Sequence, residues 1–249
     1  MLAAAIALLV FYEWSTMTRL REAHPLGFVL AWMGVALIAV AVVAGFLSFA
    51  SAVLFGFTLL AFATVAKNNG SGWLPGGILY AGLTGISLAA IRGSDLNGLK
   101  AMLVIFAVVW GTDILAYFVG RRLGGPKLAP RISPGKTWSG AIGGMIAIRP
   151  RTTPAISLSD GVVSFGAALL LFALSVFSQI GDLFESFIKR RFGVKDSSRL
   201  IPGHGGVMDR VDGLVFACFA AYLLAAAVNT LSSCTQCTVG TFLLGNGAF

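Results

Sequence analysis

Charged residues are scarce in this sequence, and their scarcity excludes an ordinary soluble domain. Of 249 residues only 11% are charged, whereas 57% are hydrophobic, and the mean hydropathy is +0.88. A soluble domain carries about 25% charged residues. Acidic residues number only 10, histidines 2 and cysteines 3. The composition is typical of a chain embedded in a lipid bilayer, and it leaves few side chains for chemistry.

Apolar runs recur along the chain at about 20 residues, the length that a helix needs to cross a bilayer. No repeat of 20–50 residues and no cleavable signal peptide is evident, so the first apolar run is interpreted as an anchor. The second and third runs are parted only around Gly45. We predict eight transmembrane helices, at residues 1–14, 27–44, 46–66, 73–91, 98–119, 137–148, 161–181 and 211–229.

The predicted fold is therefore all-α, a polytopic membrane helix bundle. We expect a single integral-membrane domain over residues 1–249. Within it we expect N-terminal helices in 1–95, catalytic helices and cytoplasmic loops in 96–230, and an atypical tail in 231–249.

Basic residues are distributed unevenly across the predicted spans. The net charge of +8 is interpreted as basic loops on one membrane face rather than as nucleic-acid binding. Four basic residues fall on one face: Arg92, Lys100, Arg149 and Arg151. The other face receives the remaining fourteen, among them the loops 120–136 and 182–210. The positive-inside rule makes that richer face cytoplasmic, and we expect the chemistry there.

The segment 181–213 carries three carboxylates beside a glycine-rich turn. Asp182 to Lys189 is predicted to continue the seventh helix, which ends near Gly193. Asp209 to Asp212 is predicted to form the first turn of the eighth helix. Carboxylate oxygens suit Mg²⁺, which proteins hold with one or two carboxylates plus substrate phosphates. The alternative reading is that an aspartate at a helix start is only a cap.

Cations and glycines surround these carboxylates. The cations that would bind phosphate oxygens are Lys189, Arg190, Lys195, Arg199 and Arg210. Gly205 and Gly206 would let backbone N–H groups approach a phosphate. Basic residues at a membrane edge also serve topology and contact with lipid headgroups. His204 is interpreted in two ways: it binds phosphate or transfers a proton, or it supports the structure of the turn.

A second constellation occupies residues 110–140. Asp113 lies within a span, where an acid is costly unless it has a function; a packing contact to Thr112 or a neighbouring helix is the alternative. The string Gly135-Lys136-Thr137 resembles the end of a Walker A loop, but Pro130 stands where that loop needs glycine, and no strand is predicted before it. What remains is a predicted phosphate site at a helix start, formed by Ser133, Lys136 and Thr137.

Residues 186–212 resemble the signature of the phosphatidate cytidylyltransferases (CDP-diacylglycerol synthases). The run reads S-F-I-K-R-x4-K-D-x-S-x2-I-P-x-H-G-G-V-x-D-R-V-D, with no mismatch over 27 positions. The segment from Asp113 through Gly120-Arg121 to Lys136-Thr137 is similar to a second motif of that family, and Glu13-Trp14 to an early one. Glu13 itself is otherwise expected to serve core or interfacial packing.

The resemblance implies a nucleotidyltransferase that uses CTP and phosphatidic acid and releases pyrophosphate. It implies a multi-pass enzyme of the inner (cytoplasmic) membrane that faces the cytoplasm, forms a homodimer and needs Mg²⁺ and a second cation. Asp182 and Asp209 would bind metal, with Asp196 and Asp212 in support. The residues implied for phosphate and substrate binding are Asp113, Arg121, Ser133, Lys136, Thr137, Lys189, Arg190, Lys195, His204, Gly205, Gly206 and Arg210.

The sequence departs from the family at several places. Position 135 is Gly where the family usually has Lys, and the chain is expected to begin at the family's second span. Residues 149–160 and those after Asn229 do not resemble the family, and Cys234 and Cys237 suggest a disulfide rather than zinc. The alternatives are transfer to another lipid phosphate, an inactive truncated member, a transporter, or a CDP-alcohol phosphotransferase.

Overall fold

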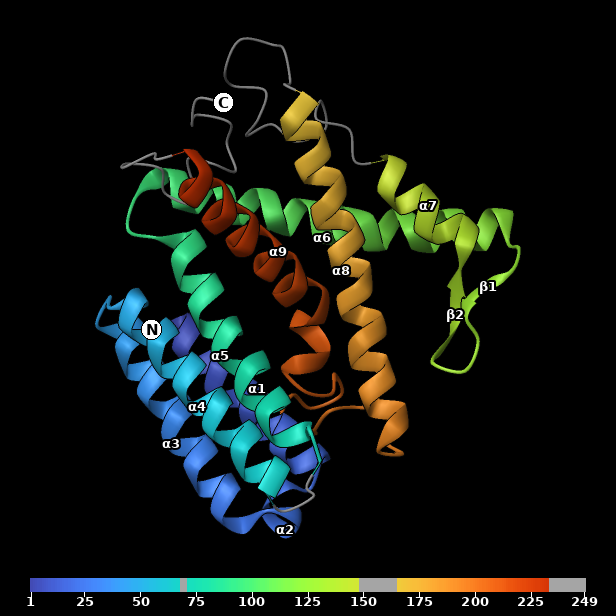
Figure 1. The fold of residues 1–249 in the computed structure, drawn as a ribbon. Coiled ribbons are helices and arrows are strands. Elements are labelled where there is room, and N and C mark those ends of the chain that lie inside the picture. The colour runs from blue at the N-terminus through green and yellow to red at the C-terminus, as the bar shows by residue number, and fades with distance from the viewer. Residues whose placement is uncertain (68–70, 148–164, 233–249) are drawn as a thin grey trace. The chain divides into compact units, whose positions relative to one another are not determined.

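The computed structural model describes residues 1–67, 71–147 and 165–232, and helices dominate these ranges (Figure 1). The helices are α1 (Leu2–Met17), α2 (Leu20–Ala23), α3 (Pro25–Val43), α4 (Leu47–Lys67), α5 (Trp73–Arg92), α6 (Leu96–Leu123), α7 (Trp138–Ala147), α8 (Phe165–Arg191) and α9 (Met208–Ser232). The two strands are β1 (Lys127–Ala129) and β2 (Ser133–Thr137). The all-α prediction is confirmed.

Six of the described helices are long and apolar enough to cross a membrane, namely α3, α4, α5, α6, α8 and α9. The other two predicted spans correspond to α1 and α7, which have 16 and 10 residues. Large apolar side chains such as Phe55 and Trp110 are 67% and 60% exposed, as expected of surfaces that contact lipid. The polytopic bundle is confirmed, whereas the count of eight transmembrane helices is not.

Helix boundaries agree with the glycine signals in the sequence. Gly45 has a φ of +83° between the end of α3 and the start of α4, a conformation that favours glycine. Gly193 has a φ of +70° and follows α8 directly. The predicted continuation of the seventh helix to Lys189 is confirmed, because α8 runs to Arg191.

Several predictions fall outside the described residues. They concern Arg149, Arg151, the segment 149–160, the first four residues of the span predicted at 161–181, and the pair Cys234 and Cys237.

The chain divides into two compact units. The first unit combines Met1–Ala89 with Lys189–Val211, and the second combines Ala90–Ile188 with Asp212–Phe249. The predicted subdivision at residues 95 and 230 stays a prediction. Residues 189–211 group with the N-terminal helices.

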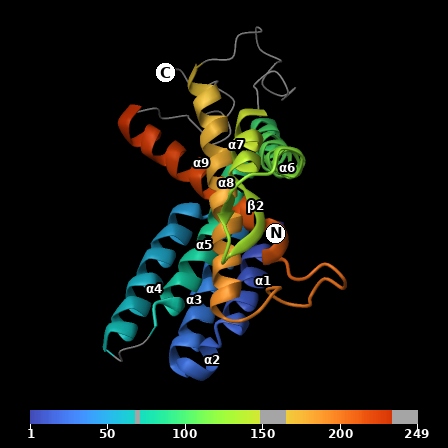
Figure 2. The same ribbon diagram turned by 90° about the vertical axis from the view of Figure 1, so that its right-hand side faces the viewer.

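In the first unit, α3, α4 and α5 lie side by side (Figure 2), and α1 packs on α3 and α5. Trp14 on α1 donates a hydrogen bond from Nε1 to the Trp73 carbonyl at 2.9 Å and stacks on Tyr80. A Cβ on Gly77 would lie 2.6 Å from the Trp14 ring, so glycine is needed there. Trp14 therefore fixes where α1 lies against α5.

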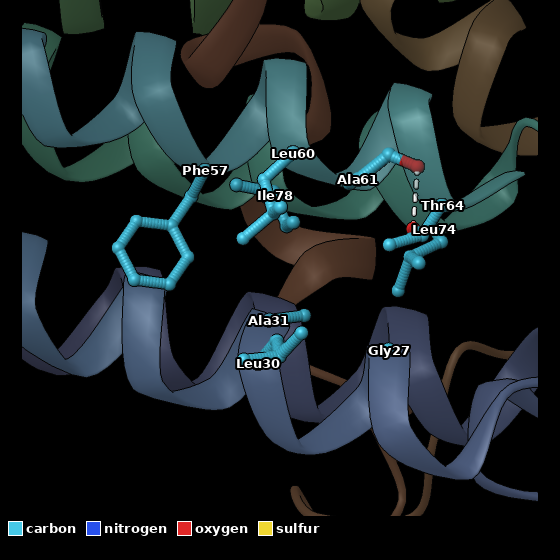
Figure 3. A pocket seen from close by; sticks show the side chains of 9 residues that line it. All are labelled: Gly27, Leu30, Ala31, Phe57, Leu60, Ala61, Thr64, Leu74 and Ile78. Carbon is cyan, nitrogen blue, oxygen red and sulfur yellow. Dashed lines mark hydrogen bonds between the residues drawn. The ribbon is translucent and has the colours of Figure 1, made fainter.

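The first unit also holds an apolar pocket between α3, α4 and α5 (Figure 3). Its lining residues are Gly27, Leu30, Ala31, Phe57, Leu60, Ala61, Thr64, Leu74 and Ile78. The Thr64 hydroxyl donates to the Ala61 carbonyl at 2.8 Å, within its own helix. The pocket lining therefore offers no cation for a phosphate, and the polar clusters described below lie elsewhere.

In the second unit, α7 lies along α6, and the hairpin β1–β2 connects them (Figure 1). The Thr112 hydroxyl on α6 lies 2.8 Å from that of Ser175 on α8. α8 and α9 pack closely, since a Cβ on Gly181 would lie 2.6 Å from the Asp212 carbonyl oxygen.

The expectation that no strand precedes Gly135-Lys136-Thr137 is wrong, because β1 precedes these residues and β2 contains them. Pro130 still excludes a Walker A loop.

Candidate active-site residues

Asp209 lies in the first turn of α9, as predicted, and its carboxylate is almost fully engaged within the first unit. Its Oδ1 accepts a hydrogen bond from Lys189 Nζ at 2.6 Å. Its Oδ2 accepts from Ser197 N and Ser197 Oγ at 2.8 Å each and from Gly206 N at 2.7 Å. The Asp209 side chain is only 8% exposed. One of its oxygens is therefore occupied by the surrounding loop, and the other contacts Lys189.

Glu13 on α1 supplies a second carboxylate to the same region. Its side chain is 0% exposed. Oε1 accepts from Val207 N at 2.8 Å and from the Ser198 hydroxyl at 2.6 Å. Oε2 accepts from Met208 N at 2.7 Å and from the Ser197 hydroxyl at 3.0 Å. The two backbone N–H groups are those at the start of α9, where a helix has no internal acceptors, so Glu13 caps that helix.

The two glycines of the turn provide space for these carboxylates. A Cβ on Gly206 would lie 2.1 Å from Ser197 Oγ and 2.5 Å from Glu13 Oε1. Gly205 has a φ of +85°, and a Cβ there would lie 2.8 Å from Asp209 Oδ2. Both glycines are thus required by close approach of the protein's own oxygens. Their predicted contact with phosphate stays a prediction.

The basic residues of the first unit differ in how much they are engaged. Arg210 donates from Nε and Nη2 to the His204 carbonyl at 3.0 and 2.6 Å. His204 Nδ1 lies 3.1 Å from the Pro202 carbonyl, which supports the reading of His204 as part of the turn. Arg190 donates from Nη1 to the Val194 carbonyl at 3.3 Å. The predicted site residues of this unit with exposed side chains are Arg190, Lys195, Asp196, Arg199, His204 and Arg210.

In the second unit, Asp182 on α8 forms an ion pair with Lys136 of β2. Both side chains remain partly open, at 30% and 27% exposed. The Ser186 hydroxyl donates to Asp182 Oδ1 at 3.4 Å, which confirms that residues four apart share one face of α8. The Asp182 carboxylate thus accepts fewer hydrogen bonds from the described residues than the carboxylates of Asp209 and Glu13.

Asp113 and Asp212 belong to the electrostatic surroundings of Asp182. Each interacts with the Asp182 carboxylate and with the Lys136 ammonium. Asp212 Oδ1 also accepts from Gly213 N at 2.8 Å, a local contact. Thr112 was the alternative partner named for Asp113. Its hydroxyl instead donates to the Val108 carbonyl at 2.7 Å and forms a hydrogen bond with Ser175. Lys136 thus pairs directly with Asp182, and Asp113 and Asp212 lie within electrostatic reach of that pair.

The predicted phosphate site of Ser133, Lys136 and Thr137 lies in β2, directly before α7. The expectation that all three begin a helix is wrong, since only Thr137 acts on the helix start. Its Oγ1 accepts from Gly140 N at 3.1 Å. Arg121, near the end of α6, donates from Nη1 to the Tyr117 hydroxyl at 2.8 Å.

Within each unit, the described His, Cys, Asp and Glu side chains form no group of three or more placed to hold a metal ion. The prediction of Mg²⁺ binding stays a prediction. The predicted pairing of Asp182 with Asp209 stays a prediction, because the two residues belong to different units.

Analysis of the sequence missed three residues of the first unit, Glu13, Ser197 and Ser198. Glu13 was expected to serve packing, whereas its carboxylate accepts four hydrogen bonds from residues 197–208. The available signal was an acid inside a helix of otherwise apolar residues, which requires partners. For Ser198 the signal was its place in the 186–212 signature.

Comparison with known proteins gives one consistent result. Residues 1–228 match the cytidylyltransferase family. A phosphatidate cytidylyltransferase of Brucella abortus is 47% identical over 223 residues, which cover 89% of this chain and 82% of that protein. A Pseudomonas aeruginosa protein of the same name is 51% identical over 138 residues, covering 52% and 49% of the two chains. One of Bacillus subtilis is 38% identical over 173 residues, covering 68% and 64%. With helices of membrane-spanning length and a match over nine tenths of its residues, the chain belongs to the cytidylyltransferase family of integral membrane enzymes.

Proposed function

We propose that this protein transfers the cytidylyl group of CTP to phosphatidic acid. A phosphate oxygen of phosphatidic acid attacks the α-phosphorus of CTP, the bond from that phosphorus to the bridging oxygen of the β-phosphate breaks, and pyrophosphate leaves. The product is CDP-diacylglycerol. The observation that carries the proposal is the family match over residues 1–228, which includes the complete 186–212 signature.

The chemistry requires that two anionic phosphates meet, so catalysis consists mainly of positioning and charge neutralisation. Lys136 supplies a cation in the second unit. In the first unit the cations are Lys189, Arg190, Lys195 and Arg210. In the second unit Ser133 and Thr137 would add hydrogen bonds. Exposed Lys195 suits a phosphate that arrives from solvent.

Magnesium is the metal that these residues fit best. Asp182 and Asp209 each present one oxygen to a lysine ammonium, of Lys136 and Lys189 respectively, at a place suited to a cation. The electrostatic interaction of Asp182 with Asp113 and Asp212 favours a divalent ion there. When bound, Mg²⁺ would neutralise phosphate charge. Asp212 and Asp196 would support it, and a second cation is part of the proposal.

The location of the site follows from the distribution of basic residues. Fourteen of the 18 Lys and Arg residues fall on one face of the predicted threading, which we propose faces the cytoplasm at the inner membrane. Phosphatidic acid would then enter from the bilayer and CTP from the cytoplasm. A homodimer is proposed from the resemblance and would be tested by cross-linking in the membrane.

The test is turnover of the purified full chain in detergent with CTP, phosphatidic acid and Mg²⁺. Release of pyrophosphate together with a CDP-lipid is expected, and both products should require all three components. Phosphatidic acid is compared with another lipid phosphate in the same assay. Faster turnover with the other lipid would reassign the acceptor, and no turnover with either by folded protein would refute the function.

A further inference from the structure

A fully buried carboxylate on α1 reaches the start of α9, although 184 to 195 residues separate Glu13 from its hydrogen-bond partners. Glu13 accepts two backbone N–H groups, those of Val207 and Met208, at 2.8 and 2.7 Å. Two hydroxyls, from Ser197 and Ser198, complete its shell. A buried charge with this many donors is retained only where its partners are fixed in place.

The position of α1 is itself fixed one residue further along. Trp14 is 1% exposed, and its indole N–H donates to the Trp73 carbonyl at 2.9 Å. The ring fills the space over Gly77, where a Cβ would lie 2.6 Å away. Because Trp14 cannot shift along α5, the Glu13 carboxylate is held at a defined point of the first unit.

From that point a chain of contacts leads to Asp209. The Ser197 hydroxyl lies 3.0 Å from Glu13 Oε2 and 2.8 Å from Asp209 Oδ2, so its single proton is shared between the two carboxylates. Gly206 N donates to the same Asp209 oxygen, directly before the residue whose N–H donates to Glu13. The direction in which Asp209 Oδ1 points is therefore set by groups that Glu13 holds.

We propose that Glu13 is a positioning residue for the reaction: it holds the 197–208 loop and the start of α9 so that Asp209 faces the metal ion and Arg210 the substrate phosphates. This inference rests on the proposed function. Glu13 itself does not touch substrate, because its carboxylate is 0% exposed and filled by four donors.

Glu13→Gln is the sharpest substitution because it keeps the size of the side chain. An amide has one acceptor oxygen and one NH₂ group that only donates. The hydroxyls of Ser197 and Ser198 can rotate and accept a hydrogen bond from the NH₂ group. A backbone N–H can only donate, so it cannot bond to NH₂. Either Val207 or Met208 must therefore lose its acceptor, whichever way the amide is oriented. Glu22→Gln on α2 is the matched control, since Glu22 is exposed in the same unit.

The experiment measures steady-state kinetics and amide hydrogen exchange of Val207 and Met208 on full-length protein in detergent. For Glu13→Gln we expect exchange about tenfold faster, a kcat about 10- to 100-fold lower, and a KM for phosphatidic acid within about threefold of wild type. Glu22→Gln is expected to match wild type in all three. Comparable melting temperatures would show that the loss is not one of global folding.

Three results would overturn the inference. If amide exchange of Val207 and Met208 is unchanged in Glu13→Gln, Glu13 does not cap α9. If exchange is faster but kcat equals that of wild type, Glu13 has no positioning role. If Glu13→Gln does not yield folded protein, Ser198→Ala decides, because it deletes one donor to Oε1, together with the acceptor of Leu200 N, and is expected to lower kcat about three- to tenfold; a wild-type kcat there would equally overturn the role. Folded wild-type protein without turnover would instead refute the proposed function, and the exchange measurement would still report on the cap.

Discussion

Two groups of acidic residues in this protein differ in how completely their oxygens are used. In the first unit, Glu13 accepts four hydrogen bonds, and Asp209 accepts four as well. In the second unit, Asp182 has an ion pair with Lys136 and one long contact from Ser186 at 3.4 Å. The acids of the two units thus differ in how many of their oxygens remain open to a further ligand.

A saturated buried carboxylate holds structure, because every lone pair it offers is taken by a donor of the protein. A carboxylate that is 30% exposed and lies within electrostatic reach of two further acids has capacity for an incoming cation. Asp209 combines the two, since Oδ2 accepts three donors of the loop while Oδ1 contacts Lys189. The substitutions described next distinguish carboxylates that stabilise the fold from those that bind a cation.

The largest effect is expected for Asp182→Asn, which removes a charge from the second unit at little change in shape. We expect kcat/KM for CTP to fall about 100- to 1000-fold, since charge at a transferring phosphate would no longer be neutralised. Asp95→Asn is the matched control. Asp95 caps α6 through Gly98 N at 2.9 Å, and asparagine caps equally well. Equal losses for both variants would contradict a special role of Asp182.

Gly206→Ala is expected to be the most damaging to stability in the first unit. The added Cβ would lie 2.1 Å from Ser197 Oγ and 2.5 Å from Glu13 Oε1, so the loop must open. We expect a loss of about 3 kcal/mol in the free energy of unfolding, or failure to accumulate. The control is Gly56→Ala in α4, where nothing lies within 4 Å of the new Cβ. Gly206→Ala as stable as this control would refute the crowded turn.

The ion pair of Lys189 with Asp209 is tested by a double-mutant cycle. The atoms are 2.6 Å apart, and the side chains are 13% and 8% exposed. The variants are Lys189→Met, Asp209→Asn and their combination, measured by unfolding in detergent. We expect a coupling energy of about 1–3 kcal/mol. Additive effects of the two substitutions would show that the contact contributes nothing to stability.

The smallest effect is expected at the start of α7. Thr137→Ala removes the acceptor of Gly140 N and should cost about 1 kcal/mol of stability. Thr137→Ser keeps the hydroxyl and should restore the melting temperature to near that of wild type. If the serine variant melts no higher than the alanine variant, the hydroxyl is not what stabilises this helix start.

Local features of the fold were predictable from the sequence because their signals are local. Apolar runs placed the long helices, glycine marked the breaks at Gly45 and Gly193, and helical spacing predicted the extension of α8. The strands β1 and β2 were missed, since a hairpin of 3 and 5 residues gives too short a pattern.

The candidate site was predictable in its residue types and not in its contacts. The 186–212 signature indicated which acids and cations matter, but hydropathy and spacing do not reveal which oxygen accepts from which donor. The partners of Glu13 lie up to 195 residues away, and such pairing follows only from the tertiary packing of α1. The contact of Gly205 and Gly206 with phosphate stays a prediction, and their close neighbours in the structure are the Asp209 and Glu13 carboxylates and the Ser197 hydroxyl.

The most direct test of the contrast between the two groups of acids is Mn²⁺ binding followed by electron paramagnetic resonance. Wild type, Asp182→Asn, Glu13→Gln and Glu22→Gln are titrated as folded protein in detergent with CTP present. Removal of an oxygen ligand should raise the Kd of Asp182→Asn at least about tenfold; Glu13→Gln, which loosens the loop around Asp209, should raise it by a smaller factor, and Glu22→Gln should bind within about threefold of wild type. Wild-type Mn²⁺ affinity in Asp182→Asn, or a loss of affinity confined to Glu13→Gln, would contradict the account.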